Sequence, residues 1–350
     1  MKDPIYICYA SSDFYARETG ISLIGFFENN PDYEPHTVFI LDYGILQSNK
    51  EKLNSVASSY GKVIEYLPAK QLLEGIQKSL HLKDFRGSLA TYSRAFIDRI
   101  IPDYVQRLLY IDSDTVVIRS ISELNIFDMG EACMAGIVSE LFSSMIKKGD
   151  LKLYSGNSRY YGCGVVLYDL NNWRTNKCYD KIINMLTIKS IYPCADQTLI
   201  NNSLSEHLFC KLPRKYNYNT HIYSPHVEYD MLNKDGWNSK DEINDAIQSP
   251  VVVHYPGRPI DRPWYAGCKS RLKDFYLSYK EMSPWKNDSL FDIPKASSFS
   301  QKYNSFLHSL EINPSTYVVL VSINAVRKIV GNLLRSVGLI KPLLPEGIEK

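Results

Sequence analysis

Two aspartates at the end of an apolar segment are the residues of this chain best suited to metal chemistry. Asp112 and Asp114 follow the apolar run 108–111, with Ser113 between them. The run is short and apolar throughout, which is typical of a strand buried on both faces of a parallel sheet. Ligands of such sheets lie beyond the carboxyl ends of the strands, where two neighbouring carboxylates favour a hard divalent cation. The alternative, for this pair alone, is a solvated acidic turn.

A third candidate ligand follows another apolar strand. Residues 251–253 are all valine, and His254 comes next. A single histidine is more often structural, but at a strand end, in a chain that already offers two carboxylates, it is a better metal candidate. The cationic, proline-rich segment 258–264 follows, and its composition is suited to covering a diphosphate.

Alternating strands and helices in the first 70 residues must position these side chains. The expected elements are strands over 5–10, 36–41 and 62–67 and helices over 15–29 and 48–60, the second helix beginning with a capping box of Ser48 and Glu51. This alternation predicts a doubly wound parallel sheet with a nucleotide-type crevice. Because no G-x-G-x-x-G or Walker A motif follows these strands, the phosphates of a bound nucleotide would need a metal.

Other segments place further polar residues near the acidic pair. A helix expected over 88–101 carries Arg94 and directly precedes the acidic strand, although a surface position is the simpler interpretation. A strand is expected over 131–138, followed by an irregular surface excursion over 139–158. Gly162 and Gly164 open the next strand and permit close backbone approach of either another strand or a ligand, structural packing being the more common explanation. Asp196 begins a later helix, where the residue type favours an N-cap.

The composition excludes several classes of protein. Lysine and arginine total 40 against 38 aspartates and glutamates, so net charge gives no reason to expect a nucleic-acid partner. The seven cysteines are scattered and form no C-x-x-C pair, which disfavours disulfides and zinc and indicates a reducing compartment. The sequence opens without a signal-peptide pattern, and no run is long enough to span a bilayer. We therefore expect a cytoplasmic protein.

The last part of the chain differs in composition from the rest, so we expect a main domain over 1–283 and a tail over 284–350. In the tail, apolar residues between Val319 and Val337 fall on one helical face, with Lys328 and Arg335 on the opposite face. Such a helix either docks on the body of the protein or lies in a membrane interface, attracted by anionic lipid.

Several segments, taken together and in order, resemble glycosyltransferase family 8, the retaining enzymes of the lipopolysaccharide galactosyltransferase and glycogenin type. The segments are ASSDFY after the first strand, LATYSRAFIDRIIP, RLLYIDSDTVV, YGCGVVLYDLNNWR, ADQTLIN and VVVHYPGRPIDRPW, and they lie within roughly residues 5–270. The resemblance implies an α/β GT-A fold, with a Rossmann-like nucleotide-binding half, a mixed sheet and a half for the acceptor. It makes 1–283 the catalytic domain.

The resemblance also implies a UDP-sugar donor and Mn²⁺, with Mg²⁺ as the alternative ion. Asp112, Asp114 and His254 match the three protein ligands of the family's metal, with Ser113 inside the same motif. A histidine beside two carboxylates suits Mn²⁺ somewhat better than Mg²⁺.

The remaining matches concern the donor. Ala10 and Asp13 match the turn that holds uracil and ribose, and Arg94 matches a residue near the donor sugar and phosphates. Asp196 matches an acceptor of hydrogen bonds from sugar hydroxyls, and Gln197 the residue that faces the anomeric carbon. Gly257 and Arg262 match the lid over the diphosphate. All of these are implied by the resemblance alone.

The chain departs from the family pattern at a few positions. The family usually has Asn-Ala-Gly where this chain has Gly162, Cys163 and Gly164, and an acidic residue where it has Ser12. The lid is longer than usual, and Arg262 replaces a lysine. No metal ligand is lost, so we expect an active enzyme. The sequence does not identify its donor sugar, and UDP-galactose and UDP-glucose are the favoured donors.

A neutral amide is a poor nucleophile, so Gln197 favours same-face attack over double displacement. The expected acceptor is a saccharide or a lipid-linked saccharide, reached from the inner face of the cytoplasmic membrane.

One alternative function is that of a haloacid-dehalogenase-type phosphatase, since Asp112 and Asp114 fit its Asp-x-Asp-x-Thr motif, but a later Gly-Asp-x-x-x-Asp pair is missing. The other is a scaffold that binds a sugar nucleotide without turnover.

Overall fold

The computed structural model describes residues 3–80, 82, 89–188, 194–220, 236–257, 259–268 and 270–293. The helix expected within 319–337 lies outside these residues, as does Arg258 of the expected lid. Within the described part, no helix is both long and apolar enough to cross a membrane.

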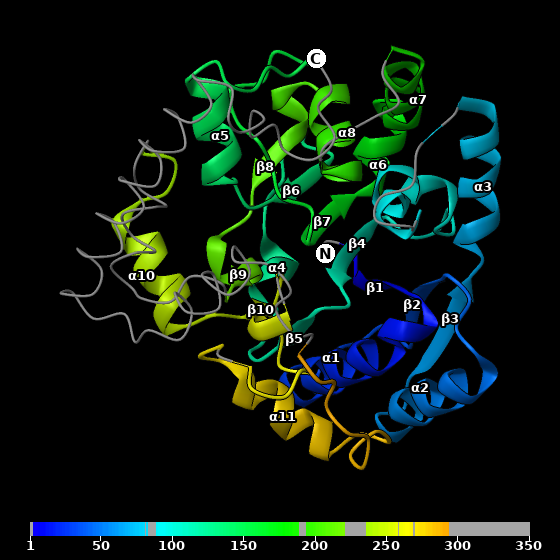
Figure 1. Ribbon diagram of the computed structural model, residues 1–350. Helices are drawn as coiled ribbons and strands as arrows, with labels where there is room; N and C mark the ends of the chain where they lie inside the picture. The colour runs from blue at the N-terminus through cyan, green and yellow to red at the C-terminus, as the bar shows by residue number, and fades with distance from the viewer. Residues whose placement is uncertain are drawn as a thin grey trace, which may run out of the picture.

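Seven strands form the central sheet, in the order β3-β2-β1-β4-β7-β6-β8 (Figure 1). Their bounds are β1 Ile5–Ser11, β2 Thr37–Asp42, β3 Val63–Leu67, β4 Arg107–Asp112, β6 Met134–Gly136, β7 Val165–Asp169 and β8 Phe209–Lys211. Strands β3, β2, β1 and β4 are parallel, as the first part of the sequence predicts. Strand β7 runs antiparallel to both β4 and β6, so the sheet is mixed.

Helices cover both faces of this sheet. The helices of the described chain are α1 Ala16–Asn29, α2 Gln47–Ser59, α3 Ala69–Leu80, α4 Glu123–Ile126, α5 Glu140–Lys147, α6 Leu170–Thr175, α7 Cys178–Ile188, α8 Ala195–Ser203, α10 Lys240–Gln248 and α11 Lys273–Glu281. Buried residues of α1 and α2 form one hydrophobic core with one face of the sheet. Residues of α3, α7 and α8 form another core with the opposite face.

The burial of β4 follows from these two cores. Leu108 and Tyr110 belong to the core on one face, and Leu109 and Ile111 to the core on the other. A strand buried on both faces has no reason to alternate apolar with polar residues, which explains its continuous apolar run. Where the run ends, Asp112 comes to the sheet edge on the same side as Tyr110, because side chains two residues apart share a face.

A smaller sheet supplies the third candidate ligand. Its order is β5-β10-β9, with bounds β5 Thr115–Val117, β9 Tyr218–Asn219 and β10 Val252–His254. Strand β5 follows β4 after a two-residue turn and pairs antiparallel with β10, opposing Thr115 to His254. This pairing carries the end of β10 to the acidic turn, and α11 packs against α1 beside it.

Several expected boundaries were wrong. The segment around Arg94 is a run of 3₁₀ turns, η2 Ala90–Arg99, interrupted by non-helical backbone at Phe96. Helix α2 begins at Gln47 with no side-chain cap, so the expected capping box does not form. The strand expected over 131–138 is reduced to β6, and the expected surface excursion contains α5.

Candidate active site

The three predicted metal ligands lie together. One ligand atom from each of Asp112, Asp114 and His254 falls within 4.8 Å of the other two. His254 Nε2 is 3.0 Å from Asp114 Oδ1 and 3.9 Å from Asp112 Oδ2. Two carboxylate oxygens and an imidazole nitrogen form a donor set that suits Mn²⁺. The residues present therefore fit the metal that the family resemblance implies.

Asn217, which no sequence pattern indicates, fixes the orientation of the His254 ring. Its Oδ1 lies 2.9 Å from His254 Nδ1 and is placed to accept the N–H of that nitrogen. Asn217 ends η4 Arg214–Asn217 and is buried. With Nδ1 occupied in this way, Nε2 is the nitrogen available to a cation.

Gly164 makes the closest backbone approach to the ligands. A Cβ atom at this position would lie 2.5 Å from His254 Cε1, 2.8 Å from its Nδ1 and 3.2 Å from Asp112 Oδ2. The carbonyl of Gly164 also accepts the backbone N–H of Asp112 at 2.8 Å. Of the glycine pair, Gly164 therefore approaches two candidate ligands, and only glycine fits there, whereas a Cβ at Gly162 would meet Ile137 at 3.2 Å.

Arg94 joins a metal ligand to the predicted sugar-binding carboxylate. One of its terminal nitrogens donates to both carboxylate oxygens of Asp112 at 3.0 Å and to the carbonyl of Cys163 at 2.7 Å. The other donates to Asp196 Oδ1 at 2.9 Å, and Nε pairs with Asp196 Oδ2 at 2.6 Å. The surface interpretation of Arg94 was wrong, because its side chain is buried. The N-cap interpretation of Asp196 was also wrong, because Cys194 is the N-cap of α8 and Asp196 lies in its first turn.

The charges in this cluster shift one another's protonation. Burial raises the pKa of Asp112, against the influence of Arg94. Burial would also raise the pKa of Asp114, but the charge and hydrogen bond of His254 hold it below its usual value. Burial would lower the pKa of His254, and Asp114 raises it instead. Burial raises the pKa of Asp196 to about 6, although Arg94 opposes the change.

Tyr110 is a further site residue that went unnoticed in the sequence. Its hydroxyl donates to Asp112 Oδ1 at 3.0 Å, and its ring lies 5.4 Å from the guanidinium carbon of Arg94. The residue stands two positions before Asp112 on the same strand, so the period of a strand would have indicated a shared face.

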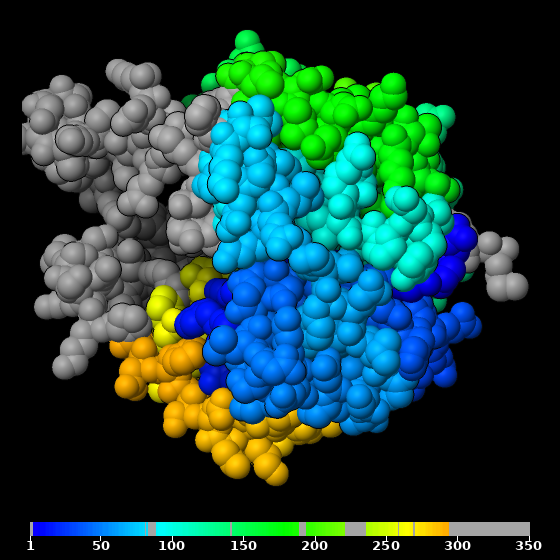
Figure 2. Space-filling model, turned by 90° about the vertical axis from the view of Figure 1, so that its right-hand side faces the viewer, coloured from blue at the N-terminus to red at the C-terminus, as the bar shows by residue number. Residues whose placement is uncertain are grey.

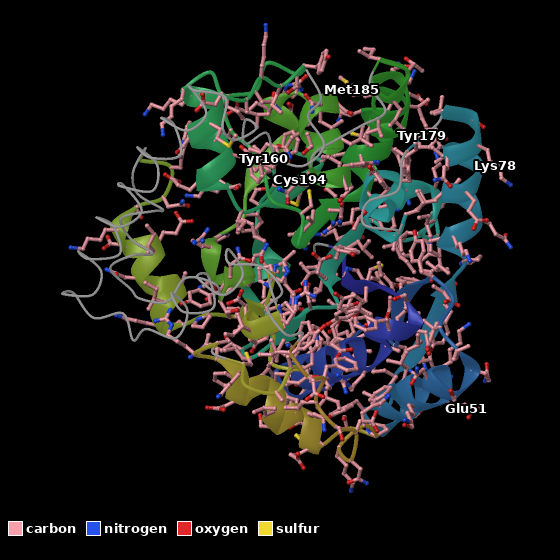
Figure 3. All side chains as sticks on the ribbon, in the orientation of Figure 1. Glu51, Lys78, Tyr160, Tyr179, Met185 and Cys194 are labelled. Atoms are coloured by element: carbon pink, nitrogen blue, oxygen red, sulfur yellow. The ribbon has the colours of Figure 1, made fainter. Side chains whose placement is uncertain are left out.

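Gln197 is held at the start of α8 by a strained turn. Ala195 has φ 48°, a left-handed conformation that is uncommon outside glycine. Gln197 Oε1 accepts the backbone N–H of Cys163 at 3.2 Å. Thr198 Oγ1 accepts the N–H of Cys194 at 3.2 Å and shares a 2.7 Å hydrogen bond with the buried Tyr160 hydroxyl. Figure 3 shows Tyr160 and Cys194 at the same end of α8.

The residues predicted to hold the base adjoin the metal ligands through strand pairing. Ala10 stands opposite Asp112 in the pairing of β1 with β4, and its carbonyl accepts the Ser113 hydroxyl at 2.8 Å. Ser113 also receives a hydrogen bond from Thr19 at 2.8 Å, so its side chain ties the acidic turn to β1 and α1. Asp13 Oδ1 accepts from Leu46 N and from the Asn49 side chain, both at 2.8 Å. This joins the turn to the start of α2.

The predicted lid residue Arg262 faces the metal ligands. It donates to the hydroxyl of Tyr15 at 3.2 Å, and its other terminal nitrogen lies 4.0 Å from Asp114 Oδ2. Its Nε is buried without a hydrogen-bond partner, which leaves a donor for an anion near the metal site. Gly257 has φ 104°, and a Cβ there would meet Asp261 at 3.1 Å, so a glycine suits the start of the lid.

Comparison with solved structures defines the class of fold. The chain resembles the structure of the galactosyltransferase LgtC in complex with donor and acceptor sugar analogs, with a TM-score of 0.63 at 18% identity over 80% of this chain and 96% of that chain. The mixed sheet is that of the GT-A glycosyltransferases, as the sequence predicted.

Sequence comparison identifies the family within that class. The model of Glycosyl transferase family 8 matches residues 6–267, and the chain belongs to this family. It is 24% identical over 290 residues to General stress protein A of Bacillus subtilis (strain 168), covering 81% of this chain and 96% of that protein. It is 30% identical over 223 residues to lipopolysaccharide 1,2-glucosyltransferase of Escherichia coli (strain K12), covering 63% of this chain and 62% of that protein.

Proposed function

We propose that this family 8 glycosyl transferase moves a hexose from a UDP-sugar to a saccharide acceptor, with retention at the anomeric carbon and with Mn²⁺. The observation that carries the proposal is the convergence of Asp112, Asp114 and His254 within 4.8 Å, next to the buried Arg94–Asp196 pair. Asp112, Asp114 and His254 would hold the metal. When bound, the metal would neutralise negative charge on the departing diphosphate.

Arginine side chains complete the binding of the diphosphate. Arg262 presents a buried Nε without a protein partner beside Asp114, and we assign it to a phosphate oxygen, with Gly257 allowing the lid to turn. Arg94 occupies both oxygens of Asp112. Asp112 would offer one of these oxygens to a bound metal, and Arg94 would then have a donor for the sugar or its phosphate. Guanidinium groups suit such partners because they bind oxyanions in pairs.

Asp196 and Gln197 act on the sugar. As a carboxylate, Asp196 accepts hydrogen bonds from sugar hydroxyls, while Arg94 keeps it in place. Gln197 is uncharged and its Oε1 already accepts the N–H of Cys163, which makes it a still poorer nucleophile. We therefore favour attack of the acceptor hydroxyl from the face that UDP leaves, with a phosphate oxygen taking the proton. Gln197 then stabilises the positive charge that develops on the sugar.

The base end lies at the carboxyl end of β1. Ala10 offers a main chain next to the acidic turn, and Asp13 has one oxygen engaged by Leu46 and Asn49. We assign Ala10 and Asp13 to uracil and ribose. Ser113 contributes by holding the metal ligands against β1. The replacement of the family's usual acidic residue by Ser12 removes one charge from this end.

Glucose and galactose are the proposed sugars, and a saccharide or lipid-linked saccharide is the proposed acceptor. Support comes from the name of the Escherichia coli relative, a lipopolysaccharide 1,2-glucosyltransferase. A lipid-linked acceptor fits a cytoplasmic enzyme peripheral on the inner face of the membrane. We keep the division into a catalytic domain over 1–283 and a tail over 284–350 as a proposal, with Trp285 at the start of the tail buried in the body.

The test is a donor screen by calorimetry and UDP release, using UDP-glucose, UDP-galactose and their N-acetyl forms with Mn²⁺ or with EDTA. One donor should bind and be slowly hydrolysed only with Mn²⁺, and Asp114→Asn should abolish both. Asp150→Asn, at an exposed carboxylate, is the matched control.

Gln197→Ala should slow turnover and leave UDP affinity nearly unchanged. Binding without turnover would favour a scaffold, and absence of binding would reject one shared donor site.

The tail is proposed to hold the enzyme on anionic lipid. Residues 294–350 hold seven lysines and arginines and three glutamates, a net charge of +4, whereas the whole chain carries +2. Removing the residues after Ser309 should release the protein from vesicles containing phosphatidylglycerol. At low salt, full-length protein with Lys328→Glu and Arg335→Glu should bind these vesicles more weakly than the wild-type protein does. Unchanged vesicle binding by both variants would reject this role.

A further inference from the structure

We propose that Phe291 is a positioning residue that clasps the diphosphate lid to the turn at the base end of the site. The inference rests on the proposed function and adds a role for a residue outside the family match at 6–267. The clasp consists of Ser289 and Phe291, in the segment that follows α11. Figure 2 shows this segment, in orange, against the blue N-terminal part of the chain.

The Phe291 ring touches both parts that it is proposed to join. On one side it stacks on Phe14, with ring centroids 5.6 Å apart and planes 7° from parallel. Phe14 directly follows Asp13 in the base turn. On the other side its ring centroid is 5.6 Å from that of Tyr265, which directly follows Trp264 at the end of the lid. Aromatic pairs at this separation stabilise one another beyond the area that they bury.

The backbone of the clasp is bonded to the lid and to helix α1, which follows the base turn. Phe291 N donates to the carbonyl of Trp264, and Ala266 N donates to the carbonyl of Phe291, both at 2.8 Å. These bonds form a bridge between the clasp and the lid. On the other side, Arg17 of α1 donates to the Ser289 carbonyl at 3.1 Å, and its guanidinium carbon lies 4.6 Å from the Phe291 ring centroid.

A short chain of contacts leads from the clasp to the metal ligands. Trp264, which accepts the Phe291 N–H, is buried, and its ring lies 5.6 Å from the guanidinium carbon of Arg262. Arg262 in turn donates to Tyr15 and faces Asp114. A shift of Trp264 would therefore move the cation that the lid offers to the diphosphate. Phe291 acts through Arg262 and touches none of the metal ligands.

Packing alone does not explain an aromatic ring at this place. Phe291 remains 37% exposed and Phe14 54% exposed, so the stacked pair adds little to the buried core. Phe275 on α11 provides a matched comparison, since it is the same residue type at 38% exposure. If Phe291 only filled surface area, truncating either phenylalanine would have the same small effect.

The test is a double-mutant cycle in the full-length protein. Phe291→Ala should weaken the binding of UDP with Mn²⁺ about tenfold, whereas Phe275→Ala should change it less than twofold. Phe291→Tyr, which keeps the ring, should bind like the wild type. In an Arg262→Ala background, Phe291→Ala should have almost no further effect, because residues that act as one unit are not additive. An equal effect in both backgrounds, or equal effects of the Phe291 and Phe275 variants, would overturn the proposal.

A second measurement needs no nucleotide and separates this proposal from the proposed function. Hydrogen exchange should be faster at Tyr265 and Ala266 in Phe291→Ala than in the wild type and unchanged in Phe275→Ala. If the wild type binds no UDP, the proposed function fails, and this exchange result still decides whether the clasp holds the lid. Unaltered exchange at both amides in Phe291→Ala would reject the clasp.

Discussion

The tightest contact at the metal site is made by a residue without a side chain. Gly164 leaves no room for a methyl group, because a Cβ would fall 2.5 Å from His254 Cε1. Gly164→Ala should therefore displace the imidazole and reduce Mn²⁺ affinity by about ten- to a hundredfold, the range seen when the support of a ligand is lost. Calorimetric titration with Mn²⁺ measures the change.

Gly75 is the matched control for that substitution. It lies in α3, where a Cβ would meet nothing within 4 Å. Gly75→Ala should leave Mn²⁺ affinity intact and raise stability by about 0.5–1 kcal/mol, since alanine restricts the unfolded chain. Equal Mn²⁺ affinity in the two variants would contradict the account of Gly164.

The protonation of Asp196 predicts a dependence of turnover on pH. Burial raises its pKa to about 6, and the proposed role requires the carboxylate. The fraction in the active form therefore rises with pH through about 6, and kcat/KM for the donor should fall on acidification below that value. The measurement is the pH profile at saturating Mn²⁺, with Mn²⁺ affinity followed at each pH to separate any loss of metal. A flat profile between pH 5 and 7 would count against this role.

Individual site residues differed in how far the sequence revealed them. Asp112, Asp114 and His254 could be predicted because each ends or follows an apolar strand, where a polar ligand stands out. Arg94 and Asp196 could be placed only through the family resemblance, since an arginine and an aspartate near helix starts have ordinary surface roles. Asn217 gave no signal, because its partner His254 comes from a strand that only the folded chain brings near.

Among the secondary-structure elements of the site, α8 begins with a strained residue. Its first residue, Ala195, is left-handed, and such conformations cost roughly 1–3 kcal/mol unless the surroundings impose them. The Thr198 hydroxyl holds this turn through Cys194 N and pairs with Tyr160. Thr198→Val leaves these groups unpaired and should lower kcat about tenfold through misplacement of Gln197.

Thr198→Ser is the conservative variant for this test, because it keeps the hydroxyl. It should retain most of the wild-type kcat, and neither variant should change UDP affinity by more than about twofold, since α8 is assigned to the sugar. Steady-state kinetics with the identified donor measures both. Similar losses in the valine and serine variants would indicate that the methyl group matters, and the hydrogen bonds would then not explain the turn.

The elements themselves were predictable where local pattern and tertiary burial agree. Strands β1 and β2 are largely apolar runs between polar turns, and β3 is a shorter run that includes Glu65. The structure confirms all three within one or two residues. The segment η2 was predicted as a helix because its apolar spacing is helical, but tertiary contacts around Arg94 impose 3₁₀ turns. Strand β6 is only Met134–Gly136. The residues next to it are equally apolar, so the sequence does not indicate where the strand begins and ends.

For the molecule as a whole, the charges of the metal site are balanced without a metal. Arg94 pairs with Asp112, and His254 pairs with Asp114. The protein should therefore stay folded in EDTA, with unchanged far-ultraviolet circular dichroism at 25 °C. Mn²⁺ at a hundred times its Kd should add about 2.7 kcal/mol of stability, which corresponds to a rise in Tm of roughly 3–5 °C for a chain of this length.

His254→Ala is the control for this thermal measurement. Its Tm should respond to Mn²⁺ much less than that of the wild type, because one ligand and the partner of Asp114 are both removed. Loss of secondary structure on adding EDTA to the wild-type protein would show that the ion pairs do not compensate for the metal.

The pairing of β5 with β10 also determines the order in which the parts of the metal site form during synthesis and folding. Asp114 and His254 are 140 positions apart in sequence, and contacts at such separations form late in folding because a long loop must close first. During synthesis, the ribosome delivers both carboxylates well before the histidine. A nascent chain can thus build the β1–β4 sheet without a complete metal site, and competence to take up the ion marks the point at which the second sheet has assembled.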